Sequence, residues 1–203
     1  MNFNSSVFYL IFIAAGYLSG SILFGDFLLR KWHGVSIEEI SDDGNPGTFN
    51  AFTYGGFWCG LFTLIGDIGK GALPVALCAS LTDTLSPVFA AVMAAPVFGH
   101  AFSLYHHGQG GKAIAVSFGV LIGLLPAHFV VFILVFYYLL FSLLLRIHAH
   151  RTRSIVTFVC FFVSCFFLEK QVSVLLGCAL ISGIVIVKHL HAPSATHERS
   201  FKS

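Results

Sequence analysis

One stretch of this sequence limits its fold more than any other: from Ala113 to Leu145 there is no Asp, Glu, Lys or Arg. A helix needs about 20 apolar residues to cross a bilayer, so this run is too long for one crossing. Proline lacks a backbone donor and clashes with the preceding turn, and Pro126 therefore predicts a break into two helices. Because 57% of the chain is hydrophobic and only 10% is charged, lipid must take up many of these side chains.

Other apolar runs of similar length occur on both sides of this stretch. Together they predict an all-α, polytopic membrane protein of seven transmembrane helices, forming a single domain over residues 1–203. The expected spans are Val7–Phe24, Phe57–Ala79, Ser86–Tyr105, Ala113–Leu125, Pro126–Leu145, Ser154–Leu168 and Val172–Val187.

The placement of the basic residues predicts how the seven spans are oriented in the membrane. Of the eleven Lys and Arg residues, all except Lys70 and Lys170 fall in gaps that share one side of a seven-span arrangement. Short cytoplasmic loops carry an excess of basic residues. The N-terminus is therefore expected outside and the C-terminus in the cytoplasm. A single helix over 113–145 would move the basic residues between 146 and 153 to the outside, which argues against six spans.

The remaining composition excludes several classes of protein and site. A formal charge of +2 with scattered basic residues does not suit a nucleic-acid-binding protein. The five cysteines all lie in apolar runs without companion ligands and are interpreted as packing residues. His148 with His150, and His189 with His191, form pairs that lack acidic or cysteine companions. No metal site is therefore expected, and these are interpreted as solvated interfacial histidines.

Three polar segments could meet at the cytoplasmic surface. They are Arg30–Thr53, which is expected to be the longest loop, His106–Lys112, and the chain after Val187. The last part of the chain, Ala192–Ser203, is polar and contains a proline, and it is expected to be mobile.

The glycine-rich segment Gly108–Lys112 is expected to open the fourth membrane helix. Free backbone N–H groups, the positive helix end and the lysine would then face an anion such as phosphate. It is not a Walker motif, because His106 stands where a glycine is required and Ala113 follows the lysine. The alternative is that the glycines allow tight helix packing and the lysine extends to the headgroups.

Asp67 and Lys70 lie within the second expected span, three residues apart and so on one helix face. An isolated charge in a bilayer is costly, so they are expected to pair with each other or with residues of other helices. A structural ion pair and a role in a site both remain open. The same holds for His100, which is either a packing residue or part of a site.

Several short motifs together resemble one known family. In order they are Gly20–Gly25 (GSILFG), Asp43–Gly47 (DGNPG) followed by Asn50, Asp67–Pro74 (DIGKGALP), Phe98–Phe102 (FGHAF) and Gly110–Lys112 (GGK). Their order and spacing are similar to those of the bacterial acyl-phosphate:glycerol-3-phosphate acyltransferases, the PlsY family. The resemblance covers about residues 16 to 126.

This resemblance implies a membrane enzyme of phospholipid synthesis in the bacterial cytoplasmic membrane. Such an enzyme transfers a fatty acyl group from acyl phosphate to glycerol 3-phosphate, or here to a related acceptor, with no cofactor and no metal. The resemblance implies catalytic roles for Lys112, His100, Asn45 and Asp43. It implies substrate or phosphate binding by Gly44, Gly47, Asn50, Gly110, Gly111 and His189.

The sequence also departs from the family pattern. Asp43 stands where the first motif has a serine, Thr53 where it has an arginine, and Gln109 and Ala113 flank the second motif. In the third motif Lys188 replaces an arginine, Ala192 replaces an asparagine, and Glu198 is displaced. Added negative charge and lost donors should weaken binding of two phosphate-bearing substrates. Two interpretations follow: an acyltransferase with an altered acceptor, or a lapsed enzyme that binds lipid or regulates other membrane proteins.

Overall fold

The structure is a computed structural model that describes residues 3–191, and within this range every regular element is a helix. The expectations for Ala192, Glu198 and the remaining C-terminal residues lie outside the described residues. In chain order the elements are α1 (Phe3–Gly20), α2 (Phe24–His33), α3 (Ile37–Ile40), α4 (Thr48–Leu81), α5 (Phe89–Ala101), a 3₁₀ turn (Leu104–His106), α6 (Ile114–Ile122), α7 (Val130–Leu139) with a π-helical continuation (Leu140–Leu144), α8 (His150–Leu168) and α9 (Val172–His191).

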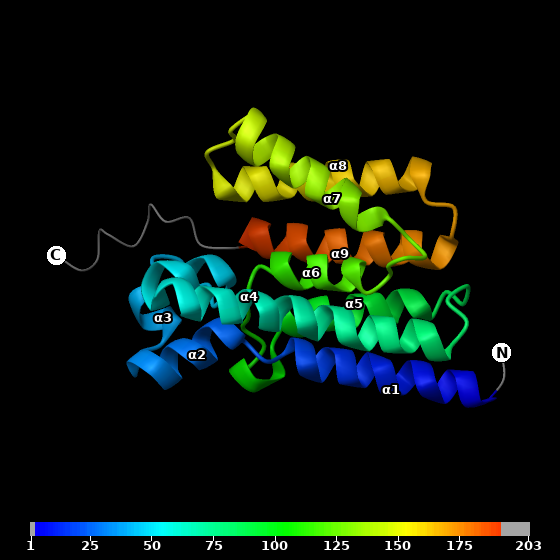
Figure 1. Ribbon diagram of the computed structural model, residues 1–203, viewed down its shortest axis with the longest axis horizontal. Coiled ribbons are helices and arrows are strands. Elements are labelled where there is room, and N and C mark those ends of the chain that lie inside the picture. The colour runs from blue at the N-terminus through cyan, green and yellow to red at the C-terminus, as the bar shows by residue number, and fades with distance from the viewer. Residues whose placement is uncertain (1–2, 192–203) are drawn as a thin grey trace.

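The long helices lie side by side along the longest axis of the molecule (Figure 1). The short helices α2 and α3 gather at one end, where α9 also finishes, whereas α1 begins at the opposite end. Four stretches are long and apolar enough to cross a membrane: Ser6–His33, Thr48–Leu81, His150–Leu168 and Val172–His191. The expectation of an all-α membrane protein is therefore confirmed.

Two breaks in the helices can be compared directly with the sequence. The apolar run from 113 to 145 is divided as expected, because α6 ends at Ile122, α7 begins at Val130, and Pro126 lies between them. The first expected span was wrong at its end: α1 stops at Gly20, and Phe24 begins a separate helix.

α4 also contains a break, although it is one continuous helix by hydrogen bonding. Gly56 has φ +77° and ψ −177°, which is not helical. Nothing lies within 4 Å of a Cβ built there, so the backbone conformation alone requires glycine. The break separates a short first segment, which carries Asn50, from the apolar segment that was expected to begin at Phe57.

Glycines allow α4 and α6 to pack closely. A Cβ on Gly119 would lie 2.1 Å from the carbonyl oxygen of Ile68, and one on Gly71 would lie 2.5 Å from that of Val116. Real side chains cannot approach backbone that closely, so each helix presents glycine where its neighbour's backbone passes. This packing fixes where the start of α6 lies relative to α4.

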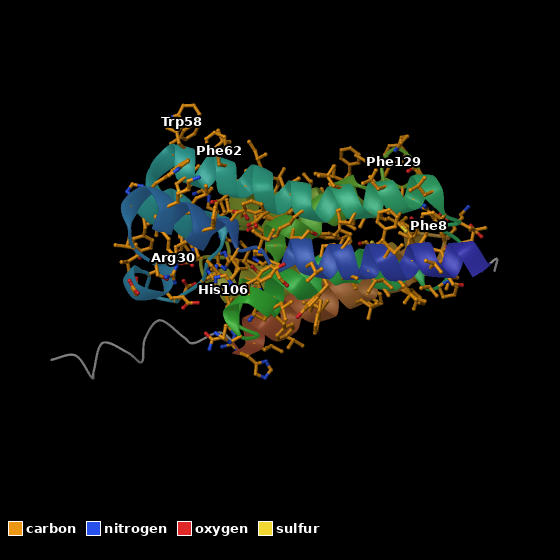
Figure 2. The ribbon with its side chains drawn as sticks, turned by 90° about the horizontal axis from the view of Figure 1, so that it is seen from below. Phe8, Arg30, Trp58, Phe62, His106 and Phe129 are labelled. Carbon is orange, nitrogen blue, oxygen red and sulfur yellow. The ribbon has the colours of Figure 1, made fainter. Side chains whose placement is uncertain are left out.

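The expectation of one long loop over Arg30–Thr53 was wrong, because the end of α2, all of α3 and the start of α4 fall within it. The buried carboxylate of Asp26 explains part of this order. It accepts hydrogen bonds from Arg30 Nε at 2.6 Å, from Ser36 Oγ at 2.8 Å and from the Ile37 amide at 3.0 Å. His106 Nε2 lies 3.6 Å away, and Arg30 and His106 lie at the same end of the molecule (Figure 2). Asp26 thereby connects α2, the start of α3 and the 3₁₀ turn.

Large apolar side chains project from the sides of the helix bundle. Trp58 and Phe62 extend from α4 near the end that holds α2, and Phe8 and Phe129 lie near the other end (Figure 2). Trp58 is 63% exposed and Phe129 is 62% exposed. Aromatic rings are enriched at the two interfaces of a membrane, and these positions match a molecule whose long axis crosses the bilayer.

Candidate functional site

The site lies where the loop before α4, the loop before α6 and the end of α9 meet. Asn50, in the first turn of α4, organises the first loop. Its Nδ2 donates to Asp43 Oδ1 at 2.8 Å and to the Asn45 carbonyl at 2.9 Å. The amide of Asn45 also donates to Asp43 Oδ1, at 3.2 Å. Gly44 makes this tight turn with φ +58°, a conformation that favours glycine.

Lys112 joins the second loop to the first through two contacts. Its Nζ donates to Asp43 Oδ2 at 2.6 Å, and its backbone amide donates to Asn45 Oδ1 at 3.2 Å. The Lys112 side chain is 18% exposed and that of Asp43 is 25% exposed. Burial alone would raise the pKa of Asp43, but hydrogen bonds from Lys112 and Asn50 hold it below the ordinary value for an aspartate. Asp43 is therefore ionised at neutral pH.

The glycines before Lys112 pass directly against His100. The amide of Gly111 donates to the His100 carbonyl at 2.9 Å. A Cβ on Gly110 would lie 2.2 Å from that carbonyl oxygen, and a Cβ on Gly111 would lie 2.2 Å from His100 Nε2. Both positions therefore need glycine because of close approach.

The start of α6 differs from the expected phosphate cradle. The helix begins at Ile114 instead of at the glycine segment, and Ala113 before it has φ +61°. The amides of Gly111 and Lys112, which were expected to be free for an anion, are already bonded within the protein. For these two amides the expectation was wrong.

Asp67 and Lys70 lie beneath this loop pair and are almost fully buried. Lys70 Nζ lies 2.7 Å from Asp67 Oδ1, 2.8 Å from His100 Nδ1 and 2.6 Å from the Ile22 carbonyl. The contact with Asp67 is an ion pair, whereas those with His100 and the Ile22 carbonyl are hydrogen bonds, and an ammonium group can only donate. His100 Nδ1 must then accept, which places the proton of a neutral His100 on Nε2, the atom that faces Gly111.

Two cavities meet at Asn45 and Lys112. One, of about 240 Å³, is mostly apolar. The other, of about 370 Å³, contains Asp43, Lys188 and His191. The apolar cavity is lined by Gly47, Thr48, Phe49, Leu64, Asp67, His100, Ala113, Ile114, Ala115, Phe118, Tyr138 and His150, besides the two shared residues. The arrangement suits a ligand with an apolar chain on one side and a polar group on the other.

His150 was missed by sequence reasoning, which interpreted it as a solvated histidine. It lines the apolar cavity, and its ring stacks on that of His189 with centroids 5.9 Å apart. His189 is 1% exposed, so the expectation of a solvated residue was wrong there too. His189 Nδ1 lies 2.8 Å from the Val185 carbonyl, and its ring lies behind His150. Only the register between α8 and α9, which the sequence does not give, brings the two rings together.

Most residues singled out from the sequence therefore gather in one place. Asp43, Asn45, Asn50, Lys112 and His100 are linked by the contacts above, and Gly44 and Gly47 shape the first loop. Among residues 3–191, no group of three or more His, Cys, Asp or Glu side chains has the arrangement of a metal site.

Residues 10–196 match the family model described as glycerol-3-phosphate acyltransferase. The chain is 41% identical over 122 residues to the glycerol-3-phosphate acyltransferase of Exiguobacterium sibiricum, a match that covers 60% of this chain and 57% of that protein. It is 34% identical over 181 residues to glycerol-3-phosphate acyltransferase 2 of Bacillus cereus, covering 89% of this chain and 87% of that protein.

A solved structure shares the fold. The crystal structure of PlsY (YgiH), an integral membrane glycerol 3-phosphate acyltransferase, in its glycerol 3-phosphate form superposes with a TM-score of 0.78 and 26% sequence identity. The superposition covers 90% of this chain and 88% of the PlsY chain.

Proposed function

Because this chain belongs to the glycerol-3-phosphate acyltransferase family, we propose that it is a membrane acyltransferase that esterifies a hydroxyl group of a glycerol-type acceptor with a fatty acyl group taken from acyl phosphate. The relatives' name indicates glycerol 3-phosphate as the acceptor. The single observation that carries the proposal is that Lys112 lies on the wall of two adjoining cavities, of which the second is also lined by Asp43 and Lys188. We assign the first part of the acyl chain to the first cavity and the acceptor to the second.

In the proposed reaction, the acceptor oxygen attacks the acyl carbon and the bond from that carbon to the phosphate oxygen breaks. Inorganic phosphate leaves and takes the proton lost by the acceptor hydroxyl. Lys112 contacts the phosphate and stabilises the charge that builds up on it. His100, with its Nε2 proton toward Gly111, and Asn45 hold the lysine loop in place. Asp43 faces the acceptor cavity.

The binding roles follow the same geometry. Gly110 and Gly111 let the lysine loop lie on His100, and Gly44, Gly47 and Asn50 shape the loop that carries Asn45. His189 supports His150 at the cavity wall. Asp67 and Lys70 form a structural charged pair. The alternative of a lapsed, purely lipid-binding homologue is not favoured, because these groups remain in contact and the relatives named above are acyltransferases.

We propose that the seven segments that contain α1, α4, α5, α6, α7, α8 and α9 each cross the bacterial cytoplasmic membrane, giving seven spans with the N-terminus outside. Supporting this, α1 begins and α9 ends at opposite ends of the molecule (Figure 1). A fluorescent protein fused after residue 203 should fluoresce, and alkaline phosphatase inserted at the Glu169–Gln171 turn should be active. Active phosphatase fused after residue 203 would contradict this orientation.

The function is tested with purified full-length protein in liposomes, palmitoyl phosphate, and either glycerol 3-phosphate or glycerol as the acceptor. Ester product should form, and Lys112→Ala should lower the rate at least about a hundredfold, the range seen when a group that stabilises transition-state charge is removed. Lys170→Ala is the matched control, because it also removes one lysine charge but lies in the turn between α8 and α9. This variant should keep its activity. No ester with either acceptor would refute the proposed function.

A further inference from the structure

His150 brings an unused hydrogen-bonding group to the wall of the apolar cavity. Its Nδ1 is enclosed by protein and has no hydrogen-bond partner within residues 3–191. Its Nε2 also has no partner in the described chain, but this nitrogen is not enclosed. A neutral imidazole carries one N–H group, and an N–H group without a partner is costly where it is enclosed. The proton of a neutral His150 therefore belongs on Nε2, the nitrogen that a ligand can reach.

The orientation of the His150 ring is fixed by the residue behind it. The rings of His150 and His189 stack with an angle of 14° between their planes. His189 is itself held in place, because it is 1% exposed and its Nδ1 donates to the Val185 carbonyl at 2.8 Å. A donor that is held in one orientation needs little reorganisation when charge develops on a bound ligand.

Several other donors around this cavity already have partners within the protein. The Lys112 amide donates to Asn45 Oδ1, and the hydroxyl of Thr48 donates to Asp67 Oδ2 at 3.4 Å. Lys112 Nζ donates to Asp43, and in the proposed function it also contacts the departing phosphate. None of these groups is left to serve a further atom of the substrate.

The acyl phosphate would bring one polar atom that still lacks a partner, the carbonyl oxygen of its acyl group. This carbonyl group lies between the chain and the phosphate. With the chain in the apolar cavity and the phosphate at Lys112, it lies in the cavity that Lys112 and His150 both line. When the acceptor oxygen attacks, an electron pair of the C=O bond moves onto the carbonyl oxygen. The pair returns when the bond to the phosphate oxygen breaks, so this oxygen is negatively charged in between.

We propose that His150 is a further catalytic residue, whose Nε2–H group donates a hydrogen bond to the acyl carbonyl oxygen and stabilises the negative charge that forms there. This inference rests on the proposed function and leaves its acceptor and its leaving group unchanged. His150 keeps its proton throughout the reaction. His189 is a positioning residue that holds the His150 ring.

The test compares the wild type, His150→Phe and His150→Gln as full-length protein in liposomes with palmitoyl phosphate and glycerol 3-phosphate. His150→Phe keeps an aromatic ring but has no donor, so kcat should fall about a hundredfold, the range seen when one donor to such an oxygen is removed. The KM for palmitoyl phosphate should change little. His150→Gln keeps an N–H donor and should be faster than His150→Phe. His148→Phe is the matched control, because His148 is exposed, and its kcat should equal that of the wild type.

Equal kcat values for His150→Phe and the wild type, or a loss confined to KM, would overturn the inference while the acyltransferase activity stands. Failure of the proposed function would instead appear as a wild type that forms no ester. Infrared spectroscopy tests the contact in either case, with palmitoyl phosphate labelled with ¹³C at its carbonyl carbon and no acceptor present. The carbonyl stretch of the bound donor should lie at lower frequency in the wild type than in His150→Phe, since a hydrogen bond weakens the C=O bond. Identical frequencies would also overturn the inference.

Discussion

Gly111 lies directly against His100, with its amide bonded to the His100 carbonyl and no space for a side chain beside His100 Nε2. Because of this contact, the position of the buried His100 determines where the loop that carries Lys112 lies. Since Lys70 also bonds to His100, the lysine at the surface of the site and the charged pair beneath it are parts of one connected structure.

Gly111→Ala should lower acyl transfer at least about tenfold. Its Cβ would lie 2.2 Å from His100 Nε2, so the loop must shift, and displacements near 1 Å have costs of this order or more. Gly183→Ala in α9, where nothing lies within 4 Å of the added Cβ, is the control and should keep activity. The rates are measured with the liposome assay above, and equal rates for Gly111→Ala and the wild type would contradict the contact.

Breaking the buried pair should destabilise the protein strongly. Asp67→Asn or Lys70→Met alone leaves one buried charge without its partner, which costs roughly 3–5 kcal/mol. The double variant removes both charges and should recover part of that loss, although His100 and the Ile22 carbonyl lose their donor. Thermal unfolding in detergent measures all three variants. A double variant less stable than either single one would show that the ion pair is not the main interaction.

The contribution of the Asp43–Lys112 pair to the stability of the folded protein should not change with pH over the range in which the enzyme is assayed. The pKa of Asp43 is lowered in the folded protein, so its stabilising contribution is present above the unfolded value of about 3.9 and is lost as pH falls through the folded value. The stability difference between the wild type and Asp43→Asn should be constant from about pH 5 to pH 8. A difference that grows or shrinks within this range, seen in thermal unfolding at each pH, would contradict this assignment.

Thr157→Val should stabilise the protein. Thr157 is fully buried in α8, and its hydroxyl has no hydrogen-bond partner within the described chain. Replacing an unpaired buried hydroxyl with a methyl group of similar shape removes a desolvation cost of about 1 kcal/mol or more. Ser117→Ala is the contrasting variant, because Ser117 Oγ donates to the Ala113 carbonyl at 2.7 Å. It should lower the melting temperature while Thr157→Val raises it.

The helices could be predicted from the sequence because the length and the polarity of a segment decide whether it can cross a membrane as a helix. α8 and α9 end within a few residues of the expected spans, and the break near Pro126 follows from proline's missing donor. The segment after Gly20 could not be predicted in this way. Its order depends on Asp26 contacting residues ten or more positions away, and such contacts leave no periodic pattern.

The site was only partly predictable for a related reason. The motif residues indicated which segments would meet, since their order and spacing resemble those of a known family. The sequence did not indicate that Asp43 would bond to Lys112, or that His150 would line the cavity. Both depend on side-chain direction and on how helices align along their axes, which pattern and composition do not specify.

The position of Lys112 on the wall of both cavities has a consequence for the order of events in turnover. In the proposed reaction, inorganic phosphate that stays at Lys112 after the ester has formed would lie at the border of both cavities. Its departure would then have to precede the binding of the next acyl phosphate at that lysine.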